Sequence, residues 1–91
     1  MNVVDTKLQM DSVNRFGDGI QSTICMEECA ELIQAISKMK RGKDAYDNLV
    51  EEMADVYIIL EQLQCIYSVA NVEIQEWLKK KQDRQRRFLE D

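Results

Sequence analysis

The feature that most restricts the fold of this chain is its scarcity of helix-breaking residues. The 91 residues contain no proline and only three glycines, Gly17, Gly19 and Gly42. Proline and glycine are the residues that most often interrupt helices, so this chain has room for long uninterrupted ones. Its hydrophobic fraction of 45% is ordinary for a globular protein. The sequence therefore predicts an all-α fold in a single domain, residues 1–91.

Two long segments have apolar residues at alternating spacings of three and four, the pattern of an amphipathic helix. The first runs from Ile20 to Arg41 and ends at Gly42, and the second follows Asp44, its predicted N-cap, and reaches Tyr67. The two predicted apolar series are Cys25, Cys29, Leu32, Ile36, Met39 and Leu49, Met53, Val56, Leu60, Leu63, Tyr67.

Two further segments flank this pair. Weak periodicity in residues 1–16 predicts a short helix or an ordered arm, and Asn71 is the predicted N-cap of a third helix that extends to Phe88. A chain this short buries only about 60 to 65% of its unfolded surface, so its own core is small. We therefore expect the two long helices to pair antiparallel and a second chain to complete a four-helix core, in a homodimer or homotetramer. The apolar side of the third helix is predicted to carry Ile74, Trp77, Leu78 and Phe88.

Charge and cysteine content argue against several functional classes. The net charge of −5 disfavours a nucleic-acid binder, which needs a basic surface. No segment approaches 18 uncharged apolar residues, so we expect no membrane partner and a cytoplasmic protein. Cys25, Cys29 and Cys65, in a chain without histidine, form neither a disulfide framework nor a zinc site, and we expect reduced thiols in the core.

Four carboxylates occupy positions where the helical pattern requires apolar side chains. On a helical wheel of about 100° per residue, Glu28 lies at the centre of the apolar arc of the first long helix, with Glu31 roughly 60° to one side. Glu52 and Asp55 have the same arrangement on the second long helix. Each long helix is therefore predicted to direct one pair of carboxylates, spaced three residues apart, toward the face that it buries.

A divalent metal ion accounts for these inward acids better than surface salt bridges do. No lysine or arginine occurs between Lys43 and Lys79, so the second pair has no cationic partner in its own helix. Four carboxylates in an apolar seam would raise one another's pKa values unless a cation lay among them. Carboxylates alone favour Mg²⁺, with Mn²⁺ as a substitute, and the absence of histidine disfavours a di-iron bundle. The alternatives are a solvated acidic face and a partner-binding surface.

The two acidic pairs resemble the signature of the MazG-type all-alpha nucleoside triphosphate pyrophosphohydrolases, an ExxE pair followed by an ExxD pair on adjacent antiparallel helices. The matching stretches are EECAE and EEMAD, and 20 residues lie between Glu31 and Glu52. The similarity covers residues 16–88, and the longer stretches EECAELIQAISK and NLVEEMADV resemble small single-domain members of the family.

This resemblance implies an enzyme that hydrolyses (d)NTP to (d)NMP and pyrophosphate, with a role in cleaning the nucleotide pool. It implies that Glu28, Glu31, Glu52 and Asp55 hold Mg²⁺ against the phosphates. Glu28 or its neighbour Glu27 is the candidate for taking a proton from the attacking water. The resemblance also implies that a neighbouring subunit helps to complete each nucleotide pocket.

Candidate substrate contacts lie outside the acidic pairs, and they are Lys38, Arg41, Lys81, Arg84, Gln21 and Trp77. Lys38 and Arg41, at the end of the first long helix, are candidate phosphate contacts. Lys81 and Arg84, in the basic part of the third helix, are candidates for the same role. Solvated helix surfaces are the alternative for both pairs. Gln21 could hydrogen-bond to a base and Trp77 could stack on one. The alternative for the Trp77 ring is a place in the core.

Two other functions stay open at this point. One is a non-catalytic helical oligomerisation or nucleotide-sensing module with the same fold. The other is the narrower activity of phosphoribosyl-ATP pyrophosphatase, which shares the architecture, although no residue of the sequence specifies that substrate.

Overall fold

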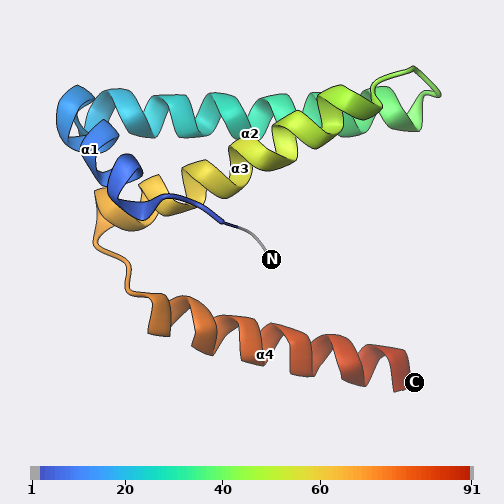
Figure 1. Cartoon of the computed structure of the whole chain (residues 1–91). Helices are drawn as coiled ribbons and strands as arrows, with labels where there is room; N and C mark the ends of the chain where they lie inside the picture. Colours follow the sequence, from blue (N-terminus) through green and yellow to red (C-terminus); the bar gives the residue numbers. More distant parts are fainter. Residues whose placement is uncertain (1–2, 91) are drawn as a thin grey trace.

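The computed structural model describes residues 3–90, and these form four α-helices and no strand. The helices are α1 (Thr6–Phe16), α2 (Asp18–Lys40), α3 (Tyr46–Tyr67) and α4 (Asn71–Glu90) (Figure 1). The predicted all-α class is therefore confirmed for the described part of the chain. A search of the same residues finds no helix with the length and apolarity needed to cross a membrane.

The helices α2 and α3 form a hairpin and run in opposite directions, as the sequence predicted (Figure 1). Gly42, with φ of 74°, lies in the turn between them, and its backbone N–H donates to the carbonyl of Met39 at 3.0 Å. This positive φ suits glycine and explains why α2 ends here. The predicted N-cap at Asp44 is wrong, because the cap residue is Ala45 and no side chain bonds the free N–H groups of α3.

The short helix α1 packs against the end of this hairpin. Its N-cap is Asp5, whose Oδ1 accepts from the backbone N–H of Leu8 at 3.0 Å. A single residue, Gly17 with φ of 90°, separates α1 from α2, while Gly19 is already inside α2. The first long helix therefore begins at Asp18, two residues before the predicted start at Ile20. Of the two predictions for the N-terminal segment, the short helix is confirmed.

The hydrophobic core of the chain is small and lies along the contact between α2 and α3, the α2–α3 seam. Its buried apolar side chains include Cys25 and Ala35 on α2 and Ile59 on α3. Only part of each predicted apolar series is covered, because the seam is centred on the positions of Glu28 and Glu52. The residues predicted on the apolar faces but found exposed are Cys29, Ile36, Met39, Met53, Leu60 and Tyr67.

The three cysteines are free thiols, as predicted, but they differ in burial. Cys25 is buried, and burial raises the pKa of its thiol. Cys65 is half-buried, and Cys29 is exposed, so the prediction of a core thiol is wrong for Cys29. Cys29 instead lines an open groove together with Leu63 and Tyr67 of α3.

The helix α4 stands apart from the other three (Figure 1). It follows a turn in which Ser68 has a φ of 54°, and it buries none of its side chains. Asn71 is its first residue rather than its N-cap, and the Asn71 Oδ1 accepts from Gln64 Nε2 at 2.7 Å. The predicted apolar side of this helix is thus uncovered within one chain, since Trp77 is 60% and Phe88 70% exposed.

Candidate metal centre

The four predicted metal ligands come together in the middle of the α2–α3 seam. One carboxylate oxygen from each of Glu28, Glu31, Glu52 and Asp55 lies within 4.8 Å of the others. Glu52 is 6% exposed, Glu28 and Asp55 are half-buried, and Glu31 is exposed. The cluster therefore reaches from the interior of the hairpin to its surface on the Glu31 side.

Helix geometry explains this convergence. Residues three apart lie on neighbouring parts of one helix face, and antiparallel pairing sets the pair on α2 against the pair on α3. The seam is closed on either side of the cluster by small or apolar side chains, Cys25 and Ile59 toward α1 and Ala35 toward the α2–α3 turn, each at most 2% exposed. None of these three side chains donates a hydrogen bond to the carboxylates.

This environment disfavours the ionised carboxylates. Burial raises the pKa of Glu28 to about 7, and the negative charges of Asp55, Glu31 and Glu52 add to the shift. Burial also raises the pKa of Glu52, with Glu31 as the largest charge contribution. The cluster therefore concentrates negative charge at a cost to the fold, a cost that a bound cation would offset.

Two oxygen atoms of the cluster have no hydrogen-bond partner. Glu28 Oε2 and Glu52 Oε2 are buried and unpaired, and Glu52 Oε1 receives only a long bond of 3.4 Å from Asn48 Nδ2. Among residues 3–90, the ion pairs involve Asp11 and Asp83 and none of the four acids. Buried carboxylate oxygens usually have donors or a cation, so this donor set fits a hard divalent ion such as Mg²⁺ or Mn²⁺.

A second polar group in the seam consists of three amides, two of which the sequence analysis missed. Gln9 of α1, Gln21 of α2 and Gln62 of α3 are all buried, and Gln62 Nε2 donates to Gln9 Oε1 at 2.9 Å. Gln21 Oε1 is buried without a partner. A signal for these residues was available, because Gln21 precedes Glu28 by seven positions and Gln62 follows Asp55 by seven, which is about two helical turns.

The other predicted site residues lie outside the cluster. Glu27 is exposed on α2, and Lys38 and Arg41 are exposed at the end of that helix, where Arg41 Nε donates to the carbonyl of Ser37 at 3.3 Å. Gln21 is in the interior rather than at a surface open to a base. These positions leave the predicted phosphate and base contacts untested.

The remaining candidates, Lys81, Arg84 and Trp77, are exposed on α4. The Nζ of Lys80 lies 4.8 Å from the centroid of the Trp77 ring, so one face of the indole is covered by a cation. Because α4 has no close backbone contact with α2 within residues 3–90, one chain does not bring these residues together with the four acids.

No protein-family model, no curated protein and no solved structure matches this chain significantly. An assignment of function therefore depends on the chemistry of the acidic cluster and on the sequence pattern that forms it.

Proposed function

We propose that this chain is an Mg²⁺-dependent nucleoside triphosphate pyrophosphohydrolase, which hydrolyses (d)NTP to (d)NMP and pyrophosphate. The observation that carries the proposal is the cluster of Glu28, Glu31, Glu52 and Asp55, whose ligand oxygens lie within 4.8 Å of one another without a cationic side chain paired to them in residues 3–90. The resemblance of the two acidic pairs to the MazG-type signature supports the choice of reaction.

The four carboxylates hold the metal ion in this proposal, and Mn²⁺ can replace Mg²⁺. The bound ion supplies charge neutralisation for the triphosphate and lowers the pKa of a bound water. Two side chains with unpaired buried oxygens, Glu28 and Glu52, form the inner part of the site. Glu31 is exposed and marks the side from which a phosphate chain can approach.

The chain's own residues then divide into binding and proton-transfer roles. A carboxylate with a free oxygen can accept the proton of the attacking water, and Glu28 is our first candidate for this step. Its neighbour Glu27 is exposed and is the second candidate. Lys38 follows Glu31 by seven residues on the same side of α2, and with Arg41 it supplies positive charge for the outer phosphates.

The experiment that tests the proposal is product analysis after incubation of the full chain with ribo- and deoxynucleoside triphosphates and Mg²⁺. The assay must resolve monophosphate plus pyrophosphate from diphosphate plus phosphate. Glu52→Gln removes a ligand while keeping the side-chain shape, and Glu51→Gln is the matched control, because it changes an exposed acid that precedes it on the same helix.

We expect monophosphate and pyrophosphate from the wild type and from Glu51→Gln, with activity reduced by at least about 100-fold in Glu52→Gln. No turnover by a wild type that binds the metal would favour the nucleotide-sensing alternative. Absence of both turnover and Mg²⁺ or Mn²⁺ binding would refute the proposed metal centre and leave a helical interaction protein.

A further inference from the structure

The helix α4 is amphipathic, although it has no close backbone contact with α1, α2 or α3 within residues 3–90. On a helical wheel, five of its six apolar residues fall within an arc of roughly 120°. We call these five residues the α4 apolar arc: Ile74, Trp77, Leu78, Phe88 and Leu89. The rest of the circumference carries all four acidic residues of the helix and five of its six basic ones. The helix therefore has one apolar side and one charged side.

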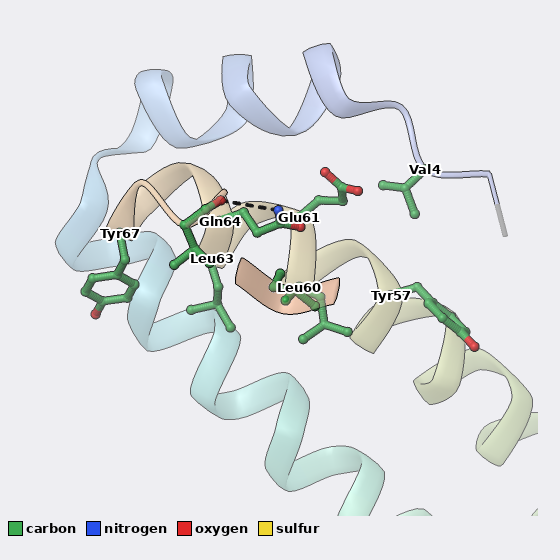
Figure 2. Close-up of a pocket in the computed structure, with 9 residues that line it drawn as sticks. Val4, Tyr57, Leu60, Glu61, Leu63, Gln64 and Tyr67 are labelled. Carbon is green, nitrogen blue, oxygen red and sulfur yellow. Dashed lines mark hydrogen bonds between the residues drawn. The ribbon is translucent and has the colours of Figure 1, made fainter. Parts of the chain in front are cut away.

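The described residues leave the α4 apolar arc uncovered. The start of the helix contributes Ile74 to an open groove of about 570 Å³. Figure 2 shows the α3 side of this groove, which is lined by Leu60, Leu63 and Tyr67. Exposure is 36% at Ile74, in the first turns of α4, and reaches 85% at Leu89, in the last turn. The C-terminal part of the arc is thus the part most open to a partner.

The basic residues of α4 are concentrated in its second half. Residues 79–87 contain six basic side chains and one acidic one, whereas the chain outside α4 contains six basic and 13 acidic residues. Lys79 and Arg86 pair with Asp83. The basic side chains of α4 that make no ion pair among residues 3–90 are Lys80, Lys81, Arg84 and Arg87. The second half of α4 is consequently a cationic surface on an acidic protein.

These cations border the apolar arc. On the wheel, Arg84 lies about 20° beyond Trp77 and Arg86 about 60° beyond Leu89, on opposite sides of the arc. Lys81 lies within the arc, but its long aliphatic chain allows the ammonium group to extend past apolar neighbours to a polar layer. An apolar side that contains Trp and Phe and has cations along both borders is typical of helices that lie in a membrane surface.

We propose that α4 binds the surface of a bilayer that contains anionic lipids, with its axis parallel to the membrane plane. The apolar arc enters the boundary between headgroups and acyl chains, and the bordering cations meet the negative headgroups. The same surface repels the acidic hairpin of α2 and α3, which stays on the water side. Membrane binding by α4 is independent of the proposed enzymatic activity.

A bilayer surface fits α4 better than a nucleic acid does. A phosphate backbone would attract the same cations but would leave Trp77, Phe88 and Leu89 in water. Lipids remove these side chains from water and supply the negative charge as well. A helix in the membrane surface needs no spanning segment, so the expectation of no membrane partner, which rested on spanning segments alone, does not extend to α4.

The experiment is a titration of the full chain with two kinds of lipid vesicle, one of phosphatidylcholine mixed with phosphatidylserine and one of phosphatidylcholine alone. Trp77 is the only tryptophan of the chain and is 60% exposed, so its fluorescence reports on the arc directly. We expect a blue shift with the anionic vesicles, binding at least about tenfold weaker to the neutral ones, and a loss of affinity at high salt.

Two matched variants separate the arc from the rest of the protein. Phe88→Glu places a charge in the arc, and Phe16→Glu makes the same change at the end of α1, where Phe16 is 54% exposed compared with 70% for Phe88. We expect Phe88→Glu to weaken vesicle binding at least about tenfold and Phe16→Glu to bind like the wild type. Because α4 buries none of its side chains, Phe88→Glu should keep the fold, which circular dichroism without vesicles checks.

Four results would each overturn the proposal. They are the absence of a blue shift with anionic vesicles, equal affinity for neutral vesicles, an equal loss of binding in both glutamate variants, and a Trp77 emission that is already blue-shifted without lipid. The last result would show that the arc is covered in the free protein. A groove on another protein would also cover the arc, but then vesicles of lipid alone would not bind.

Discussion

The helices α3 and α4 are similar in length, 22 and 20 residues, but they have opposite environments. The helix α3 buries Glu52 and Ile59 and has acids but no base, while α4 buries nothing and contains half of the basic residues. The cations of α4 pair locally, with Asp83 accepting from Lys79 at 3.2 Å and from Arg86 at 2.7 Å. The basic residues of α4 therefore do not pair with the acids of α3, and no ion pair of the described residues involves the buried acids.

The largest expected difference between the two helices is in the cost of removing apolar side chains. Ile59 is 2% exposed between the acids and the amides, so Ile59→Ala should lower the free energy of unfolding by about 2 to 5 kcal/mol. Leu89 of α4 is 85% exposed, so Leu89→Ala should change the free energy of unfolding by less than about 0.5 kcal/mol. Denaturant unfolding measures both, and similar costs would show that α4 is as well packed in solution as α3.

The next difference is the response to Mg²⁺. Saturation at 100 times the dissociation constant should stabilise the wild type by about 2.7 kcal/mol, because only the folded cluster binds the ion. Glu28→Gln should lose this gain and be more stable than the wild type in EDTA, since it removes a buried negative charge.

Thermal unfolding with and without Mg²⁺ tests this expectation, and Glu51→Gln is the control for the loss of one exposed charge from α3. A stabilisation by Mg²⁺ that survives in Glu28→Gln would separate the ion's effect from the acidic cluster. If Glu51→Gln lost the stabilisation by Mg²⁺ to a similar extent, that stabilisation would be due to general charge screening.

The pH dependence of stability should differ in sign between the two regions. Glu28 has a pKa of about 7 in the fold against 4.5 ordinarily, so the folded state holds the proton more tightly than the unfolded state. Its contribution is therefore complete below pH 4.5 and is lost as the pH rises to 7. Unfolding of metal-free protein at several pH values measures this loss, which should be smaller in Glu28→Gln; a flat profile for the wild type would show that the carboxyl is not buried in solution.

The smallest effect concerns the local charge pairs of α4. The hydrogen bond from Lys79 lowers the pKa of Asp83, so the contribution of this carboxylate is present above pH 3.8 and is lost as the pH falls. Asp83→Asn should slightly reduce the helical circular dichroism signal, and high salt should weaken the wild type by a similar amount. A large loss of structure in Asp83→Asn would mean that this residue joins α4 to another helix or to a second chain.

The residues whose positions were predicted correctly depend on spacing within one helix, whereas the misplaced ones depend on contacts between helices. The inward direction of Glu28 and Glu52 was predicted, because a helical wheel depends only on spacing within the helix. Met53, Leu60 and Tyr67 were assigned to the core, yet they are exposed. The apolar surface of α3 extends around most of the helix, and spacing alone does not indicate which part meets α2.

The missed amides illustrate the same limit. Gln9 and Gln62 are polar and appear as surface residues in a sequence, but α1 folds over the end of the hairpin and buries both together. Asp44 is a suitable N-cap by residue type, yet the turn after Gly42 makes Ala45 the cap residue instead. In both cases the outcome depended on how the chain turns between helices rather than on the preferences of the residues.

By itself, the sequence determined the three longer helices of the described residues and the inward direction of the two carboxylate pairs. Both follow from local spacing and from the near absence of helix breakers, since backbone hydrogen bonds within a helix span only four residues. Only the tertiary structure decided that Met53, Leu60 and Tyr67 of α3 are exposed and that α4 buries none of its side chains. Coverage of a side chain depends on helices distant in the sequence, and their packing is a property of the whole chain.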